Sequence, residues 1–222
     1  MLQRVTRTDV SADAFRFLDV AEMNVGRSPA IVDRVSLTGE LGYEIWVPSL
    51  HLRDVYTQLL AAGDDHGIRQ IGVHALLGMR LEKAFGIWGR EYSPDYTPSM
   101  NEMHRFVDWS KDDFVGRAAA AADRDGIPAR TLHLMEVDAP LDDPGASDAA
   151  GFEPIFVGAD KVGYVTSGGF GHRSGKSLAM AYLDAGTADA SLAHEVLIIG
   201  RRRRATILDE LPFDPDGSRM RS

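Results

Sequence analysis

The stretch TGELGYEIWV, residues 38–47, places a strand directly behind a glycine-rich turn. Gly39 and Gly42 can take a positive φ at little cost, so residues 38–42 predict the turn. From residue 43 the side chains alternate between two faces, and the apolar face takes Tyr43, Ile45 and Val47. Glu44 and Trp46 fall on the opposite face. We therefore expect a carboxylate beside a large aromatic ring on a short strand.

The segments on either side predict a mixture of helices and strands. Ala30–Leu37 is rich in apolar residues and predicts a strand before the turn. Ser49 is a suitable N-cap for a helix whose apolar residues recur at helical spacing until Gly63, a natural stop. A second helix is expected over residues 72–85, where an otherwise apolar stripe contains one odd member, Arg80.

The second half of the chain is predicted to be mostly β structure. Residues 118–123 predict the end of an alanine-rich helix, Thr131–Val137 alternates like a strand, and Pro140–Gly151 predicts an exposed loop. Four short apolar runs follow between glycine-containing turns: Val162–Thr166, Leu178–Leu183, Glu195–Ile199 and Ala205–Leu208. Such spacing predicts a small barrel or sandwich. The expected fold class is α+β, with an α/β part over residues 1–125 and an antiparallel β-barrel over residues 126–222.

The composition excludes several classes of protein. The chain has 222 residues, of which 44% are hydrophobic and 26% charged, as expected of a folded domain with a sizeable core. Its net charge of −9 disfavours non-specific binding to nucleic acid or to an anionic membrane. Cysteine is absent, which excludes disulfides and thiolate sites and fits a reducing compartment, for which we expect the cytoplasm. We find no apolar run long enough for a membrane span.

The segment 168–177, GGFGHRSGKS, ends like a phosphate-binding P-loop but has the wrong spacing. A P-loop needs four residues between its first glycine and the Gly-Lys pair, whereas Gly171 leaves three and Gly169 leaves five. The residues that follow also alternate like a strand rather than a helix. We therefore expect a glycine-rich β-hairpin here.

Two other features of the sequence suggest chemistry but have simpler interpretations. Arg201–Arg204 could be a phosphate or nucleic-acid patch, yet a hairpin with its arginines splayed to both sides and balanced by nearby acids suits the negative net charge better. The seven histidines form no metal-binding pair of the HExxH kind, so no metal site is predicted. His172, in the glycine-rich turn, is expected to be a surface residue.

Glu44 and Arg80 are the candidates that remain open. Glu44 could accept paired N–H donors from a flat heterocycle, or it could be an ordinary solvent-facing residue of a strand. Arg80 could serve a ligand, or it could pair within the fold with an acid such as Glu82 or Glu91.

Several motifs in a fixed order resemble the folate-dependent aminomethyltransferase family. This family includes the T-protein of the glycine cleavage system and the folate-binding part of dimethylglycine and sarcosine dehydrogenases. The matching motifs cover essentially the whole chain: Thr38–Glu44, Met79–Lys83, Trp88-Gly89, Phe106–Trp109, Phe114–Arg117, Val162–Gly169 and Leu211–Pro215. Each motif is weak alone, but their shared order is specific.

The resemblance implies one-carbon chemistry on tetrahydrofolate, with a small amine-bearing compound as the other substrate. In the family, a methylene unit on an amine nitrogen passes to the folate nitrogens. The glutamate that matches Glu44 holds the pterin ring, and a carboxylate can accept two parallel N–H bonds from its aminopyrimidine edge. Trp46 and Trp88 would supply apolar walls. Arg80 would serve the folate or buttress its helix through Glu82.

The chain also departs from the family pattern. Leu37 stands where dimethylglycine-oxidising relatives commonly carry a tyrosine, and Leu76 stands where T-proteins usually carry an arginine. The family's folate domain begins well before the position that matches Met1, and that earlier part carries the aspartate that orients the folate nitrogen. We therefore expect an incomplete folate-binding α/β subdomain with no catalytic residue assigned, so enzymatic activity stays open. No GxGxxG fingerprint points to a flavin domain.

A second hypothesis is non-enzymatic. The chain would be a structural or interaction module that completes its fold against a partner chain or a second copy, and an exposed apolar surface would mark the contact. Nucleic-acid binding through Arg201–Arg204 is a third and remote hypothesis.

Overall fold

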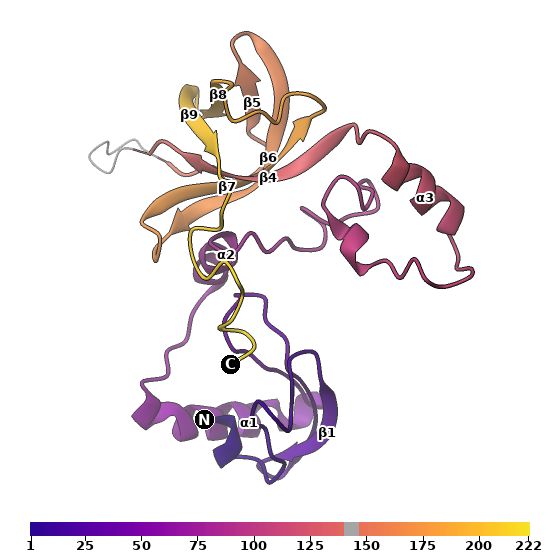
Figure 1. Ribbon diagram of the computed structural model, residues 1–222. Helices are drawn as coiled ribbons and strands as arrows, with labels where there is room; N and C mark the ends of the chain where they lie inside the picture. The colour runs from indigo at the N-terminus through magenta and orange to yellow at the C-terminus, as the bar shows by residue number, and fades with distance from the viewer. Residues whose placement is uncertain (140–146) are drawn as a thin grey trace. The chain divides into compact units, whose positions relative to one another are not determined.

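A computed structural model describes residues 1–139 and 147–222 (Figure 1). The chain divides into two compact units: Met1–Leu76 together with Asp214–Ser222, and Leu77–Phe213. An α/β region followed by a closed antiparallel barrel confirms the predicted α+β class. The predicted division at residue 125 stays a prediction.

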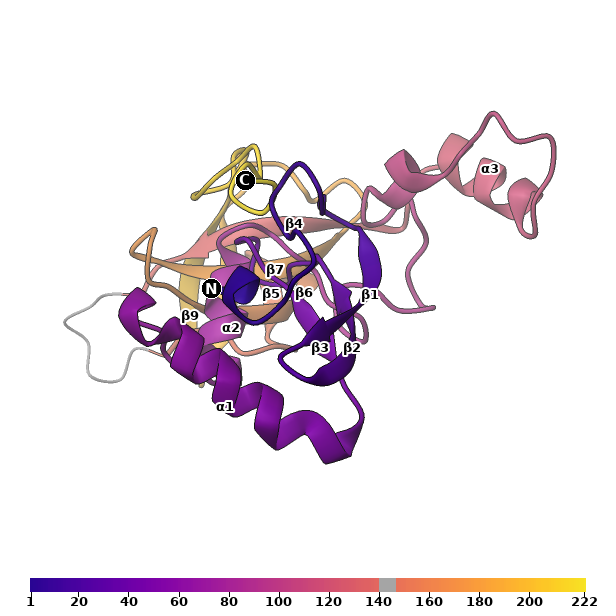
Figure 2. The same cartoon turned by 90° about the horizontal axis from the view of Figure 1, so that it is seen from below.

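The first unit is built on a three-stranded antiparallel sheet in the order β1-β2-β3. Its elements are η1 (Leu2–Arg4), β1 (Val20–Val25), β2 (Ser28–Asp33), β3 (Glu44–Trp46), η2 (Ser49–His51), α1 (Leu52–Gly63) and η3 (Asp64–His66). Gly26 takes a positive φ of 62° in the two-residue turn between β1 and β2, as such hairpins require. Figure 2 shows α1 lying alongside this sheet.

One face of the sheet packs into the core of this unit. The alternate residues Met23 and Val25 of β1, and Ala30 and Val32 of β2, are buried there together with Val55 of α1. Tyr43, Ile45 and Val47 pack against the same cluster, which confirms the predicted alternation around β3. The opposite face of the sheet therefore carries the intervening residues of each strand, such as Glu22, Ile31 and Trp46.

The second unit is dominated by a closed barrel with the strand order β4-β7-β6-β5-β8-β9 (Figure 1). Its strands are β4 (Arg130–Val137), β5 (Pro154–Val157), β6 (Asp160–Gly171), β7 (Lys176–Asp184), β8 (His194–Ile198) and β9 (Arg201–Ile207). The segment before β4 holds η4 (Met103–Phe106) and α3 (Arg117–Asp125), and in both views α3 lies apart from the barrel strands. Helix α2 (Val73–Leu81) leads into this unit.

Strand β7 is buried on both faces, which explains its nearly continuous apolar sequence. Ala179, Ala181 and Leu183 point into the barrel core. Leu178 and Met180 form a second cluster with Leu81 of α2 and with Leu134. This second cluster fixes the end of α2, and hence Arg80, against the outside of the barrel wall.

The structure differs from the predicted elements in several places. The strand expected over residues 30–37 is β2, Ser28–Asp33. Ser49 does not cap α1, because it lies in η2 and the N-cap of α1 is His51. Helix α2 ends at Leu81 rather than Phe85, because the chain turns at Ala84 with a positive φ of 50°. Strands β1 and β5 were not predicted. The expected exposed loop 140–151 lies partly outside the described residues, and within its described part the expectation is wrong for Ala149, which is 2% exposed in the barrel core. Among the described residues, no helix has the length and apolar character needed to cross a bilayer.

Candidate functional site

Glu44 and Trp46 lie on the outer face of the three-stranded sheet, as the sequence predicts. The cross-strand register places Glu44 opposite Asp33, and Trp46 opposite Ile31. Both side chains are exposed, and Trp46 retains 59% of its surface. The Glu44 carboxylate has no hydrogen-bond or ion-pair partner among the described residues. It is therefore free to accept donors from a ligand.

Asp33 orients the indole ring of Trp46. The indole Nε1–H donates to Asp33 Oδ2 at 2.9 Å, across one strand spacing. This bond uses the only polar group of the indole, so the flat faces of the ring remain for apolar or cationic contacts. Asp33 was not predicted as a site residue, although it lies in the expected strand five residues before the turn that starts at Thr38 and, once paired with Glu44, shares a face with Trp46.

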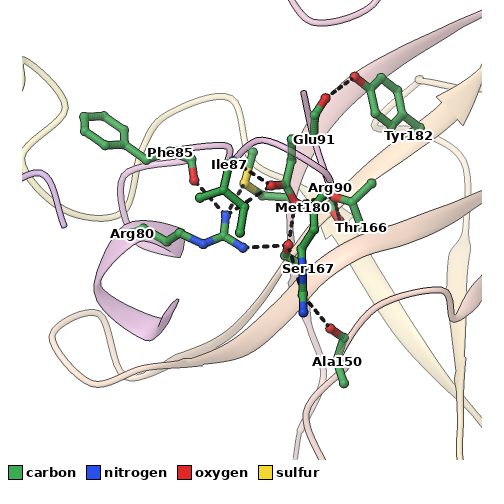
Figure 3. A network of polar contacts seen from close by, with 10 residues as sticks. All are labelled: Arg80, Phe85, Ile87, Arg90, Glu91, Ala150, Thr166, Ser167, Met180 and Tyr182. Carbon is green, nitrogen blue, oxygen red and sulfur yellow. Dashed lines mark hydrogen bonds and ion pairs between the residues drawn. The ribbon is translucent and has the colours of Figure 1, made fainter. Parts of the chain in front are cut away.

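Arg80, the second predicted site residue, is completely buried and forms an ion pair with Glu91 (Figure 3). The distance between Arg80 Nη1 and Glu91 Oε2 is 3.3 Å. Arg80 also donates to the main-chain oxygen of Phe85 at 2.7 Å and to Ser167 Oγ at 2.6 Å. Burial lowers the pKa of Arg80, and the adjacent carboxylate opposes that shift. Because an arginine remains ionised even so, the site holds a buried guanidinium that depends on one carboxylate.

Glu91 is the centre of this polar network. Its Oε1 accepts from the hydroxyl of Thr166 at 2.6 Å and from the hydroxyl of Ser167. Its Oε2 accepts from the main-chain N–H of Ile87 at 3.0 Å. Its main-chain oxygen accepts from the buried phenol of Tyr182 at 2.8 Å (Figure 3). Glu91 thus fixes the loop after α2 to strands β6 and β7.

Trp88, the third predicted site residue, is carried by this fixed loop. Gly89 N–H donates to the main-chain oxygen of Tyr92 at 2.7 Å, and Tyr92 N–H donates to that of Ile87 at 3.1 Å. The indole of Trp88 is 75% exposed. Together with the Ile87–Glu91 contact, these bonds close a short loop that presents a large aromatic side chain on a rigid support.

The structure decides between the two partners proposed for Arg80. Glu82 faces a different segment: its Oε1 accepts the main-chain N–H of Arg173 at 2.8 Å and that of Ser174 at 2.7 Å. Glu91 is the acid that pairs with Arg80. The network thus places Arg80 in a supporting position behind the Trp88 loop, while a direct role toward folate stays a prediction.

The glycine-rich segment 168–177 forms the β6–β7 hairpin that the sequence predicts in place of a P-loop. Gly168 lies in β6, where a Cβ atom would stand 2.2 Å from the main-chain oxygen of Ala149. Glycine is therefore required at this position by the close approach of the main chain at Ala149, and not by phosphate binding. His172 lies exposed in the turn, as expected.

The arginine cluster forms part of the β8–β9 hairpin, again as predicted. Arg202 pairs with Glu195 at 3.2 Å and lies over the ring of Phe156. Arg203 points inward and is buried. The described residues hold no cluster of three or more histidine or acidic side chains that could bind a metal ion.

Comparison with known proteins gives matches over both halves of the chain. The family model described as "GCVT N-terminal domain" matches residues 1–111, and "Glycine cleavage T-protein C-terminal barrel domain" matches residues 130–214. The chain is 34% identical to mitochondrial dimethylglycine dehydrogenase of Mus musculus, over 95% of this chain and 24% of that protein. It is 32% identical to an aminomethyltransferase of Moorella thermoacetica, over 96% of this chain and 56% of that protein.

A solved structure shows the same fold. The crystal structure of glycine cleavage system aminomethyltransferase T from Bartonella henselae superposes with a TM-score of 0.70 at 24% identity, over 84% of this chain and 50% of that chain. The chain thus spans about half the length of the aminomethyltransferases and a quarter of the dehydrogenase that it matches.

Proposed function

The chain belongs to the glycine cleavage T-protein family, and on this premise we propose that it is a tetrahydrofolate-binding, aminomethyltransferase-like protein of one-carbon metabolism. The relatives named aminomethyltransferase and dimethylglycine dehydrogenase support this assignment. When bound, the folate supplies the nitrogens that accept a one-carbon unit from an amine. The proposed compartment is the cytoplasm, which the absence of cysteine supports.

The observation that carries the proposal is the unpartnered carboxylate of Glu44. The strand fixes the face on which Glu44 lies, and its carboxylate gives up no existing partner when it accepts donors from a ligand. The aminopyrimidine edge of a pterin presents two N–H donors side by side, which match the two oxygens of one carboxylate. The two acceptor oxygens of Glu44 thus fit the two donors of the folate.

Trp88 and Arg80 have different roles in the proposal. Trp88 offers an exposed aromatic face, on which a flat ring or the aminobenzoyl part of a folate can stack. Arg80 acts through the fold: its ion pair with Glu91 holds the Trp88 loop in one conformation. A rigid support reduces the entropy lost when the ligand is captured.

Calorimetric titration of tetrahydrofolate tests the proposal. We expect the wild-type chain to bind and Glu44→Gln to bind about 10–100-fold more weakly, because a hydrogen bond to a charged group contributes about 1.5–3 kcal/mol. Glu22→Gln is the matched control, since it removes a carboxylate from the same sheet face without touching Glu44. Failure of the wild-type chain to bind, or equal binding by Glu44→Gln, would reject this function.

A second candidate function, an interaction module that completes its fold with another chain, is favoured by one observation. The outer face of the sheet leaves large apolar side chains exposed on all of its strands: Val20, Ile31 and Trp46. Light scattering over a range of concentrations separates the two. A monomer that binds folate supports the first function, whereas self-association that Trp46→Ser abolishes supports the second.

A further inference from the structure

The outer face of the β1-β2-β3 sheet contains a pocket that Glu44, Arg80 and Trp88 do not line. Its volume is about 650 Å³, within the ~300–1,000 Å³ usual for small-molecule sites. Its lining comes from β1, β2, the end of β3 and the two residues after it, and includes Glu22, Pro29, Ile31, Trp46 and Pro48. All of the lining lies within the first unit.

Three of the lining residues form one row across the sheet. Glu22 pairs with Ile31, and Ile31 pairs with Trp46, so their side chains point to the same face. Neighbouring strands lie about 4.8 Å apart, which puts the carboxylate-bearing and indole-bearing positions about 10 Å apart. Ile31 forms an apolar floor between them. The row can hold one compact group between a negative charge and an aromatic face.

The indole of Trp46 is presented with its faces available. Its Nε1–H is held by Asp33, so the ring has a preferred orientation and no unmet polar group. Trp46 remains largely exposed. Tryptophan gives the strongest cation–π contact of the aromatic side chains.

The charges around the pocket select cations. Glu22 has no hydrogen-bond or ion-pair partner among the described residues. The three strands contain no lysine or arginine, and the exposed Arg27 lies in the β1–β2 turn, beyond the Asn24–Pro29 pair rather than in the row of Glu22 and Trp46. Asp33 and Glu44 stand in the next row and add negative potential. A ligand that itself carries a carboxylate would be repelled.

We infer that this pocket binds a small organic cation, a methylated ammonium group without an attached carboxylate. The ammonium would lie over Ile31, between the Glu22 carboxylate and the face of Trp46. Pro29 and Pro48 offer apolar contacts to its methyl groups. This site shares Trp46 with the apolar walls expected for the folate and gains negative potential from Glu44, but its own charged contact is Glu22, which is not among the proposed folate contacts.

The test is a ¹H–¹⁵N spectrum of the full chain, in which each of its three tryptophans gives one indole signal. The Trp46 signal is identified by its loss in Trp46→Phe. Choline is the probe, 3,3-dimethylbutan-1-ol is its uncharged isostere, and glycine betaine carries the same ammonium with a carboxylate. With ionic strength held constant, we expect choline to move the Trp46 signal with a Kd on the order of 1–10 mM. The isostere and betaine should bind at least about tenfold more weakly.

Two variants complete the test. Glu22→Gln should weaken choline binding about fivefold or more, whereas Glu195→Gln, on the barrel, should leave it unchanged. Glu22 is exposed, so its substitution keeps the fold, as the dispersion of the spectrum will show. Equal shifts with the uncharged isostere, no movement of the Trp46 signal, or full binding by Glu22→Gln would each overturn the inference. Folate binding is tested by calorimetry with Glu44→Gln, and cation binding by the Trp46 indole signal with Glu22→Gln. Either proposal can therefore fail without the other.

Discussion

Loss of the Glu91 charge should destabilise this protein far more than loss of an exposed carboxylate. Arg80 and Glu91 are both fully buried, with 3.3 Å between Arg80 Nη1 and Glu91 Oε2. At an effective dielectric constant of about 20, that separation corresponds to an attraction of about 5 kcal/mol. Glu91→Gln keeps the shape of the side chain but leaves the Arg80 guanidinium as an uncompensated buried charge. We expect a loss of about 3–5 kcal/mol in the free energy of unfolding.

Chemical and thermal unfolding of the intact chain will measure this loss. At roughly 2–4 °C per kcal/mol for a chain of this size, Tm should fall by about 6–20 °C. Glu195→Gln is the matched control, because the side chains of the Glu195–Arg202 pair are 37% and 38% exposed and such surface pairs contribute only about 0–1 kcal/mol.

A double variant separates the effect of charge from that of packing. Arg80→Met combined with Glu91→Gln removes both charges, while the amide oxygen at position 91 can still accept from the Thr166 and Ser167 hydroxyls. This double variant should therefore recover part of the stability lost in Glu91→Gln. Equal unfolding free energies for Glu91→Gln and Glu195→Gln would refute the reasoning. So would a double variant less stable than Glu91→Gln by several kcal/mol.

Three further predictions concern other parts of the chain. Trp88→Ala should weaken tetrahydrofolate binding by about tenfold while changing Tm little, because the ring is exposed and makes no core contact; unchanged affinity in calorimetry would contradict this. Gly168→Ala should cost about 1–3 kcal/mol in denaturant unfolding, because the new Cβ would stand 2.2 Å from the main-chain oxygen of Ala149; wild-type stability would show that this approach is not tight. Burial lowers the pKa of His133, so the folded state binds fewer protons than the unfolded state. The stability that depends on neutral His133 should therefore be fully present above pH ~6.5 and be lost as the pH falls below that value. In thermal melts across pH 5–8, His133→Gln should remove this part of the dependence of Tm on pH.

The sequence predicts regular alternation well and tertiary partners poorly. The placement of Glu44 and Trp46 opposite Tyr43, Ile45 and Val47 follows from the two-residue period of a strand alone. Strand β1 has the same period, with Met23 and Val25 buried and Glu22 exposed, yet its mixed polar composition weakens the signal. The end of α2 was predicted too late, because the turn at Ala84 depends on a backbone conformation that the local sequence does not mark.

The partners within the buried Arg80–Glu91 network could not be predicted from the sequence. Arg80 interrupts an apolar stripe, which signals a polar partner but leaves Glu82 and Glu91 equally acceptable. The choice depends on the loop folding back over β6 and β7, which brings Thr166 and Ser167 to Glu91 from 75 and 76 residues away. No local pattern records such a contact.

The most direct test of the central claim is a thermodynamic cycle between Glu44 and the 2-amino group of the pterin. Calorimetry would compare the wild-type chain and Glu44→Gln with tetrahydrofolate and with an analogue in which a methyl group replaces that amino group. We predict that the substitution weakens tetrahydrofolate binding about 10–100-fold but changes binding of the analogue less than about threefold. An equal loss for both ligands would contradict the account, because Glu44 would then not contact the pterin edge.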